Sequence, residues 1–198
     1  MDLARSELID DVKNNRYSKI IKSKIIIDDE IFQYICQFCD LMTVVHFVEH
    51  KKVKIKDIHL FSACKRHDDL VIRYLISKGF KPIVMMKTMR INNRNSCLSV
   101  ACLHGSLDIV QFLVAEQNCP LYANKKFPTP LYDSISQKHT KIINYILEQS
   151  VKRGIKYGED EILMAIKMGD QNTIKYLIDH GMLECDLGKI KSFVYGIW

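Results

Sequence analysis

Residues 101–114 read ACLHGSLDIVQFLV, and this stretch decides the fold. After the turn, Ile109, Val110 and Leu113 recur at the spacing of one face of a helix. Gly105, which precedes that run, suits the left-handed conformation that often follows the end of a helix. The stretch therefore predicts two helices joined by a tight polar turn.

The same pattern occurs at four other places in the chain. Three copies align clearly and read ACKRHDDLVIRYLI at 63–76, SISQKHTKIINYIL at 134–147 and AIKMGDQNTIKYLI at 165–178. A fifth copy, less regular in its first helix, ends at residue 48. The second apolar residues of the second helices are spaced by 27, 38, 33 and 31 residues; they are Val45, Ile72, Val110, Ile143 and Ile174. Periods of about 20–50 residues indicate stacked supersecondary units.

Fixed residue types mark the packing faces and ends of the expected helices. Each first helix carries an apolar residue followed three positions later by a small one, which lets the neighbouring unit approach closely. These pairs are Leu60/Ala63, Leu98/Ala101, Leu131/Ser134 and Ile162/Ala165. Thr129-Pro130 predicts an N-cap followed by proline in the first helical turn. Glycines are expected just after first and second helices alike, at Gly79, Gly105, Gly169 and Gly181.

These motifs resemble the ankyrin-repeat consensus. The resemblance is carried by TPL at 129–131, by Ala101 with His104-Gly105, by LDIVQFL at 107–113 and by IKYLIDHG at 174–181. It implies an all-α ankyrin-repeat solenoid of about five to six helix-turn-helix repeats with degenerate terminal caps. The degenerate copies and the heavy use of isoleucine and lysine are similar to the ankyrin proteins that large AT-rich DNA viruses encode.

The expected organisation is one array with two atypical ends. Residues 1–29 form an N-terminal cap or a degenerate repeat, residues 30–185 form the repeats, and residues 186–198 form a C-terminal cap. The expected repeats are 30–57, 58–95, 96–128, 129–158 and 159–185. The aromatic tail Phe193–Trp198 has two interpretations, since its side chains either cover the last repeat or form an exposed docking segment.

Composition fits a globular unit rather than a disordered or fibrous chain. Of 198 residues, 47% are apolar and 26% are charged, and no apolar run approaches the roughly 20 residues of a membrane helix. The charged N-terminus lacks an apolar signal region, so export is not expected. Seven cysteines, an odd number, favour reduced thiols in the cytosol or nucleus, of a host cell if the source is viral.

We predict no enzyme activity, no cofactor and no metal. The strongest metal candidate combines Cys36 and Cys39 with His46 and His50, the residue types of tetrahedral zinc. Six residues separate the two pairs, whereas a zinc finger of this class has about twelve, so we interpret them as helix and core positions. No strand pattern precedes Cys36, which weighs against a redox motif. No nucleophile, base and oxyanion set occurs at a recognisable spacing.

The resemblance also implies where a partner binds. In ankyrin arrays the partner meets the concave face, which the inter-repeat loops and the exposed side of the first helices form. Alignment carries these positions over to Phe61, Lys65, Leu103, Tyr132 and Lys167. The loops add Met86, Lys87, Arg90 and Arg94 in the long segment 81–95, and Tyr122, Lys125 and Lys126 in the next loop. The alternative for the long segment is a loop packed against the second helices, with its methionines filling a gap.

Charge is concentrated in the middle of the chain. The net charge is +6, residues 81–158 carry +7 and residues 159–198 carry −3. The leading hypothesis is a monomeric, non-catalytic protein-interaction scaffold whose partner is an acidic protein, with no membrane contact. The alternative is binding of nucleic acid or another polyanion through the basic central loops, which predicts an affinity that falls steeply with salt. The dominance of lysine over arginine and the lack of a nucleic-acid motif weigh against it.

Overall fold

The computed structural model describes residues 3–14, 16–82, 96–122 and 128–184. Within these ranges the chain forms twelve helices. In order they are α1 (Leu3–Lys13), α2 (Tyr17–Lys22), α3 (Asp29–Phe38), α4 (Leu41–Glu49), α5 (Asp57–Ala63), α6 (Leu70–Ser77), α7 (Cys97–His104), α8 (Leu107–Ala115), α9 (Pro130–Ser136), α10 (Thr140–Lys152), α11 (Glu159–Met168) and α12 (Gln171–Asp179). The described ranges hold no strand beyond a single parallel bridge between Tyr157 and Leu183. The predicted all-α class is confirmed.

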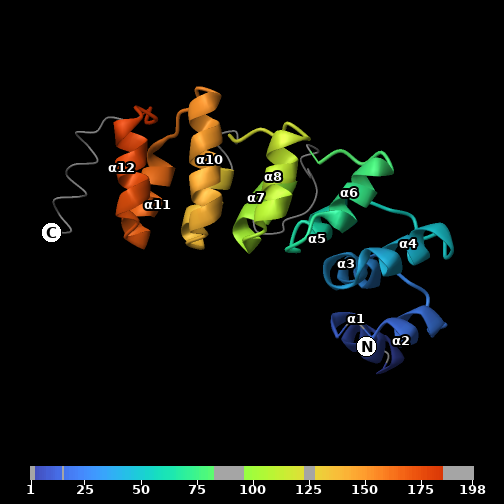
Figure 1. Ribbon diagram of the computed structural model, residues 1–198. Coiled ribbons are helices and arrows are strands. Elements are labelled where there is room, and N and C mark those ends of the chain that lie inside the picture. The colour runs from blue at the N-terminus through green and yellow to red at the C-terminus, as the bar shows by residue number, and fades with distance from the viewer. Residues whose placement is uncertain (1–2, 15, 83–95, 123–127, 185–198) are drawn as a thin grey trace.

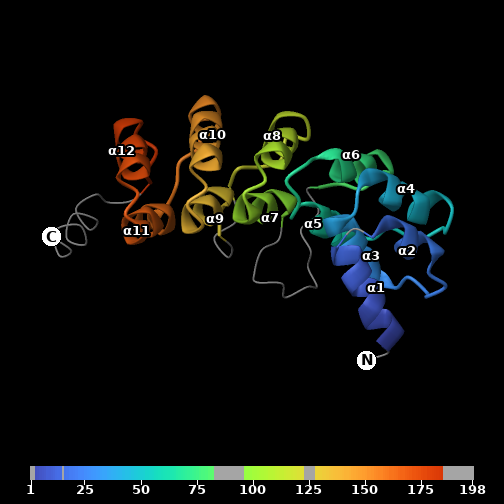
Figure 2. The ribbon, with the colours of Figure 1, turned by 60° about the horizontal axis from the view of Figure 1, so that its bottom comes forward.

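The helices follow one another in pairs, and the pairs form a curved row from α1/α2 to α11/α12 (Figure 1). From α5 onward, first helices lie in one layer and second helices in the other (Figure 2). First helices pack on the first helices of neighbouring pairs, and among the second helices α4 packs on α6, α8 on α10 and α10 on α12. Because each pair contacts mainly its neighbours, the stability of such an array is close to a sum of local terms.

A continuous apolar core lies between the two layers. All four apolar–small pairs predicted from the first helices are buried, and none of their members exposes more than 1% of its surface. In the second helices Ile72, Val110 and Ile143 are buried, while Val45 in α4 and Ile174 in α12 are half-buried. The sequence pattern therefore identified the packing faces correctly.

The helix ends also form where the local sequence predicts them. Thr129 accepts a hydrogen bond from the Tyr132 N–H at 3.1 Å, and Pro130 is the first residue of α9. Gly105 and Gly169 end α7 and α11 with φ of 78° and 70°, a left-handed conformation that residues with a Cβ adopt only at a cost.

Candidate functional site

Polar side chains in the turns that follow helices bind carbonyl groups of the preceding unit. A ring nitrogen of His139, Nε2, lies 3.2 Å from the Leu103 carbonyl oxygen. Arg153 donates to the Val114 carbonyl at 2.9 Å, and Arg66 binds carbonyls at the end of α3 in the same way. These groups are committed to fixing the register of neighbouring units, so the surface that remains for a partner consists of other residues.

The structure places six of the predicted contact residues, and they differ in accessibility. Phe61 in α5 is 8% exposed and therefore offers little area to a partner. Lys65, Leu103 and Tyr132 are half-buried. Tyr122, after α8, is 65% exposed, and Lys167 in α11 is exposed. The other predicted residues, Met86, Lys87, Arg90, Arg94, Lys125 and Lys126, lie outside the described ranges.

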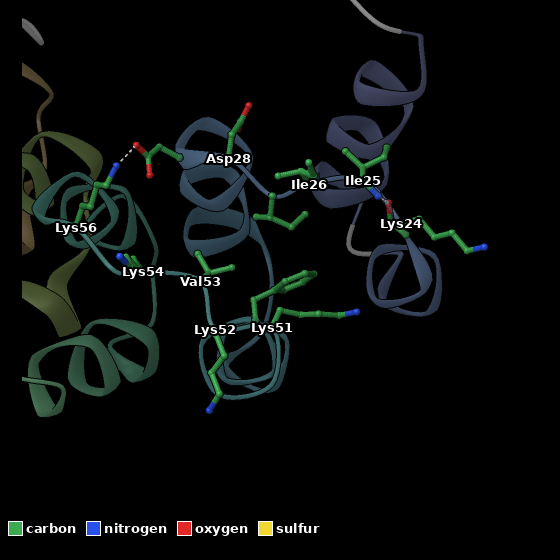
Figure 3. Close-up of a pocket in the computed structure, with 13 residues that line it drawn as sticks. Lys24, Ile25, Ile26, Asp28, Lys51, Lys52, Val53, Lys54 and Lys56 are labelled. Atoms are coloured by element: carbon green, nitrogen blue, oxygen red, sulfur yellow. Dashed lines mark hydrogen bonds and ion pairs between the residues drawn. The ribbon is translucent and has the colours of Figure 1, made fainter.

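A groove near the N-terminal end was not predicted from the sequence. Segment 23–28, which follows α2, and segment 51–56, which follows α4, lie on its two sides (Figure 3). This N-terminal groove has a volume of about 650 Å³. The sequence signal was present, because residues 22–27 read KSKIII and residues 51–56 read KKVKIK. Both runs combine lysine with β-branched apolar residues, which also suits an ordinary solvated loop.

The lining of the N-terminal groove combines apolar and basic side chains. Its apolar part comes from three isoleucines, Val53 and Phe47. Its charged part comprises five lysines and two aspartates: Lys24, Lys51, Lys52, Lys54, Lys56, Asp28 and Asp29.

Both aspartates already have basic partners. Arg5 donates to Asp28 at 2.8 Å, and Lys56 forms an ion pair with Asp29. Burial disfavours the ionised form of Asp28, but the Ile31 N–H and Arg5 outweigh it and lower the pKa of this carboxyl. The unpaired charge of the groove is therefore positive.

A buried histidine lies beside the ion pair between Lys56 and Asp29 at one end of the groove. His59 in α5 is fully buried, and its Nδ1 accepts the Lys56 N–H at 3.0 Å. The Nδ1 atom is therefore unprotonated, and Nε2, 3.8 Å from Asp29 Oδ1, carries the proton. Burial lowers the pKa of His59 to about 4, although Asp29 opposes this effect. His59 is neutral in the folded protein at pH 7.

This histidine predicts a loss of stability in mild acid. The unfolded chain protonates His59 near pH 6.5 and the folded chain only near pH 4, so the unfolded state binds more protons between these values. Stability conferred by the neutral ring is present above pH 6.5 and is lost as pH falls toward 4. We expect about 2 kcal/mol less unfolding free energy from this group at pH 5 than at pH 7.

Urea unfolding of the wild type and of His59→Asn measures this contribution. Asparagine keeps an acceptor for the Lys56 N–H but does not titrate. The wild type should lose more stability than the variant between pH 7 and pH 5. Equal losses in the two proteins would show that His59 does not titrate as described.

The four residues that the sequence offered as zinc ligands lie in, or directly after, two different helices. Cys36, in α3, and Cys39, directly after it, are buried, and the Cys39 thiol faces the Val12 carbonyl at 3.9 Å. Burial raises the pKa of the Cys39 thiol to about 12 and that of Cys36 further. His46 lies in α4 and His50 directly after it, with ring centroids 5.3 Å apart. In the part of the chain that the structure describes, no three His, Cys, Asp or Glu side chains are placed to hold a metal ion.

Comparison with known proteins gives one family match. A family model described as ankyrin repeats (3 copies) matches residues 60–157 and 98–189. No curated protein matches the chain. Among the described helices, none has both the length and the apolar character needed to cross a membrane.

Proposed function

The chain belongs to the ankyrin-repeat family, and we propose that it is a non-catalytic scaffold that binds a protein partner through its inter-repeat loops and the accessible side of its first helices. Ankyrin repeats are generally protein-interaction domains, and the family is typically non-catalytic. One observation carries the proposal: the stacked pairs bury their apolar faces against each other and present their loops one after another along the row. Such a series of loops suits an extended contact.

The chemistry of the partner follows from the charge of the middle units. Residues 81–158 carry +7, and the segments 81–95 and 121–127 add methionine, tyrosine and phenylalanine to their lysines and arginines. Basic groups steer an acidic partner toward the surface, and methionine adapts to the shape of what it contacts. We therefore propose an acidic protein partner that contacts the middle repeats.

Replacing Met86 by Ser, Lys87 by Asp and Arg90 by Asp should abolish capture of that partner. The triple change removes an apolar contact and reverses two charges, while the melting temperature should stay unchanged because the segment lies between helix pairs. Pull-down followed by mass spectrometry measures capture, and circular dichroism measures melting. The matched control is Met42→Ser with Lys19→Asp and Lys175→Asp, three exposed positions outside residues 81–158. Undiminished capture by the first variant would refute this placement.

A further inference from the structure

We propose that the N-terminal groove binds an extended acidic segment of a partner protein that carries an apolar side chain at its centre. The inference rests on the proposed function, because it specifies what a protein-binding scaffold of this kind recognises. It assigns a contact site to the loops after α2 and α4, whereas the sequence directed attention to the segments after α6 and α8.

The size and shape of the groove suit a peptide backbone. Its volume of about 650 Å³ lies within the range of about 300–1,000 Å³ typical of ligand sites. Its sides are two non-helical segments from successive units (Figure 3). An extended peptide directs successive side chains to opposite sides, so one apolar side chain can face the apolar lining while its neighbours reach the basic groups.

The apolar lining provides one half of the recognition. Ile26 is 88% exposed, and Ile25, Ile27 and Val53 are half-buried around the same hollow. An isoleucine left in water at the edge of a hollow gains most when a ligand covers it. Covering Ile26 should contribute about tenfold or more to affinity.

The lysines of the groove provide the second part of the recognition, an attraction for acidic groups. Because Asp28 and Asp29 are paired with Arg5 and Lys56, they do not cancel the remaining positive charge. Lys24, Lys51 and Lys54 are exposed and have no ion-pair partner among the described residues. Carboxylates of a bound peptide would meet these ammonium groups, and the complementarity would raise both the rate of encounter and the selectivity for acidic sequences.

The lining favours a peptide over a nucleic acid or a bilayer. Single-stranded nucleic acids bind by stacking bases on accessible aromatic rings, whereas Phe47, the aromatic residue of this lining, is 2% exposed. Bilayers are bound by several apolar groups that project from a surface and insert between lipids, whereas Ile26 is the one strongly exposed apolar side chain of this lining and Ile25, Ile27 and Val53 are half-buried.

Fluorescence anisotropy with a defined probe tests the proposal on the full chain. The probe is a fluorescein-labelled peptide of about nine residues, with aspartate and glutamate flanking a central leucine; at about 3.3 Å per residue it spans about 30 Å when extended. We expect saturable binding, and binding at least about tenfold weaker when glutamine and asparagine replace the acids. Lys24→Glu with Lys51→Glu and Lys54→Glu should weaken binding by at least about tenfold. Ile26→Ser alone should weaken it by about tenfold.

The matched control is Lys141→Glu with Lys156→Glu and Lys175→Glu, which changes the net charge equally at exposed positions away from the groove. It should bind the peptide like the wild type, and far-ultraviolet circular dichroism of every variant should match the wild type. Equal weakening by both lysine triples would overturn the proposal, because it would show attraction by net charge alone.

Three further outcomes would overturn the proposal. They are no saturable peptide binding by the wild type, binding of phosphatidylserine vesicles or of single-stranded DNA without peptide binding, and self-association that depends on Lys24, Lys51 and Lys54. The proposed function is tested separately. If the groove triple still captures the partner that the wild type captures and the peptide does not bind, the groove assignment fails while the scaffold function stands.

Discussion

Replacing Phe32 by alanine is expected to lower the free energy of unfolding by about 3–5 kcal/mol. Phe32 lies in α3, is fully buried, and meets the His59 ring edge-on with centroids 4.8 Å apart. The change removes a large apolar side chain and leaves a cavity between α3 and α5, which pack closely on each other. Because His59 would lose its covering ring, the variant should also lose part of the pH dependence predicted above.

Phe38 in the same helix provides the control. It is 39% exposed and stacks on Tyr34, with centroids 6.2 Å apart. Phe38→Ala should cost less than about 1 kcal/mol by urea unfolding. Hydrogen exchange should show the effect of Phe32→Ala mainly in α1–α6, since units of a stacked array interact with their neighbours. An equal loss of protection in α9–α12 would contradict the local packing described for the array.

Replacing Gly105 by alanine is expected to lower the free energy of unfolding by about 2–4 kcal/mol. Two causes act together at this position. The left-handed backbone, with φ of 78°, is unfavourable for alanine. In addition, the new Cβ would lie 2.7 Å from the His139 ring, so the imidazole must move and give up its contact with the Leu103 carbonyl.

Gly169 separates the two causes because it ends α11 in the same conformation, with φ of 70°. A Cβ there would have no neighbour within 4 Å among the described residues. Gly169→Ala should therefore cost only the backbone strain, about 1–2 kcal/mol. In a His139→Ala background the extra cost of Gly105→Ala should disappear, which a double-mutant cycle by urea unfolding measures. Equal costs for the two glycines in the wild-type background would show that His139 accommodates the Cβ freely.

Much of the fold was predictable because it depends on local patterns repeated along the chain. The apolar–small pairs, such as Leu98/Ala101, are buried in every copy, so the repetition itself indicated their role in packing. Thr129-Pro130 and Gly105 act within one turn of their own helices and need no distant partner. In these helix ends, the residues that interact are also close together in the sequence.

The N-terminal groove was not predictable for the opposite reason. Ile26 and Val53 are separated by 26 other residues, and they line the same hollow only because α3 and α4 lie between their segments in the chain. A run such as KKVKIK is as typical of a solvated loop as it is of a binding groove. The burial of His59 was missed as well, because a lone histidine in a short helix gives no periodic signal.

The predicted contact residues differ in accessibility, and the sequence anticipated only part of this difference. Tyr122 and Lys167 are accessible, as contact residues should be. Phe61 was carried over by alignment, but it lies where its helix packs in the core and is almost covered. An alignment transfers a position within a repeat, whereas the curvature and the neighbouring units decide how much of that position stays accessible.

Affinity capture from the native cell tests the central claim most directly, with the full chain as bait, nuclease treatment and mass spectrometry of what is retained. We expect one or more proteins to be retained in near-stoichiometric amounts, with acidic segments and with nuclease having no effect. Retention of nucleic acid alone, or loss of every retained protein after nuclease treatment, would contradict the assignment as a protein-binding scaffold.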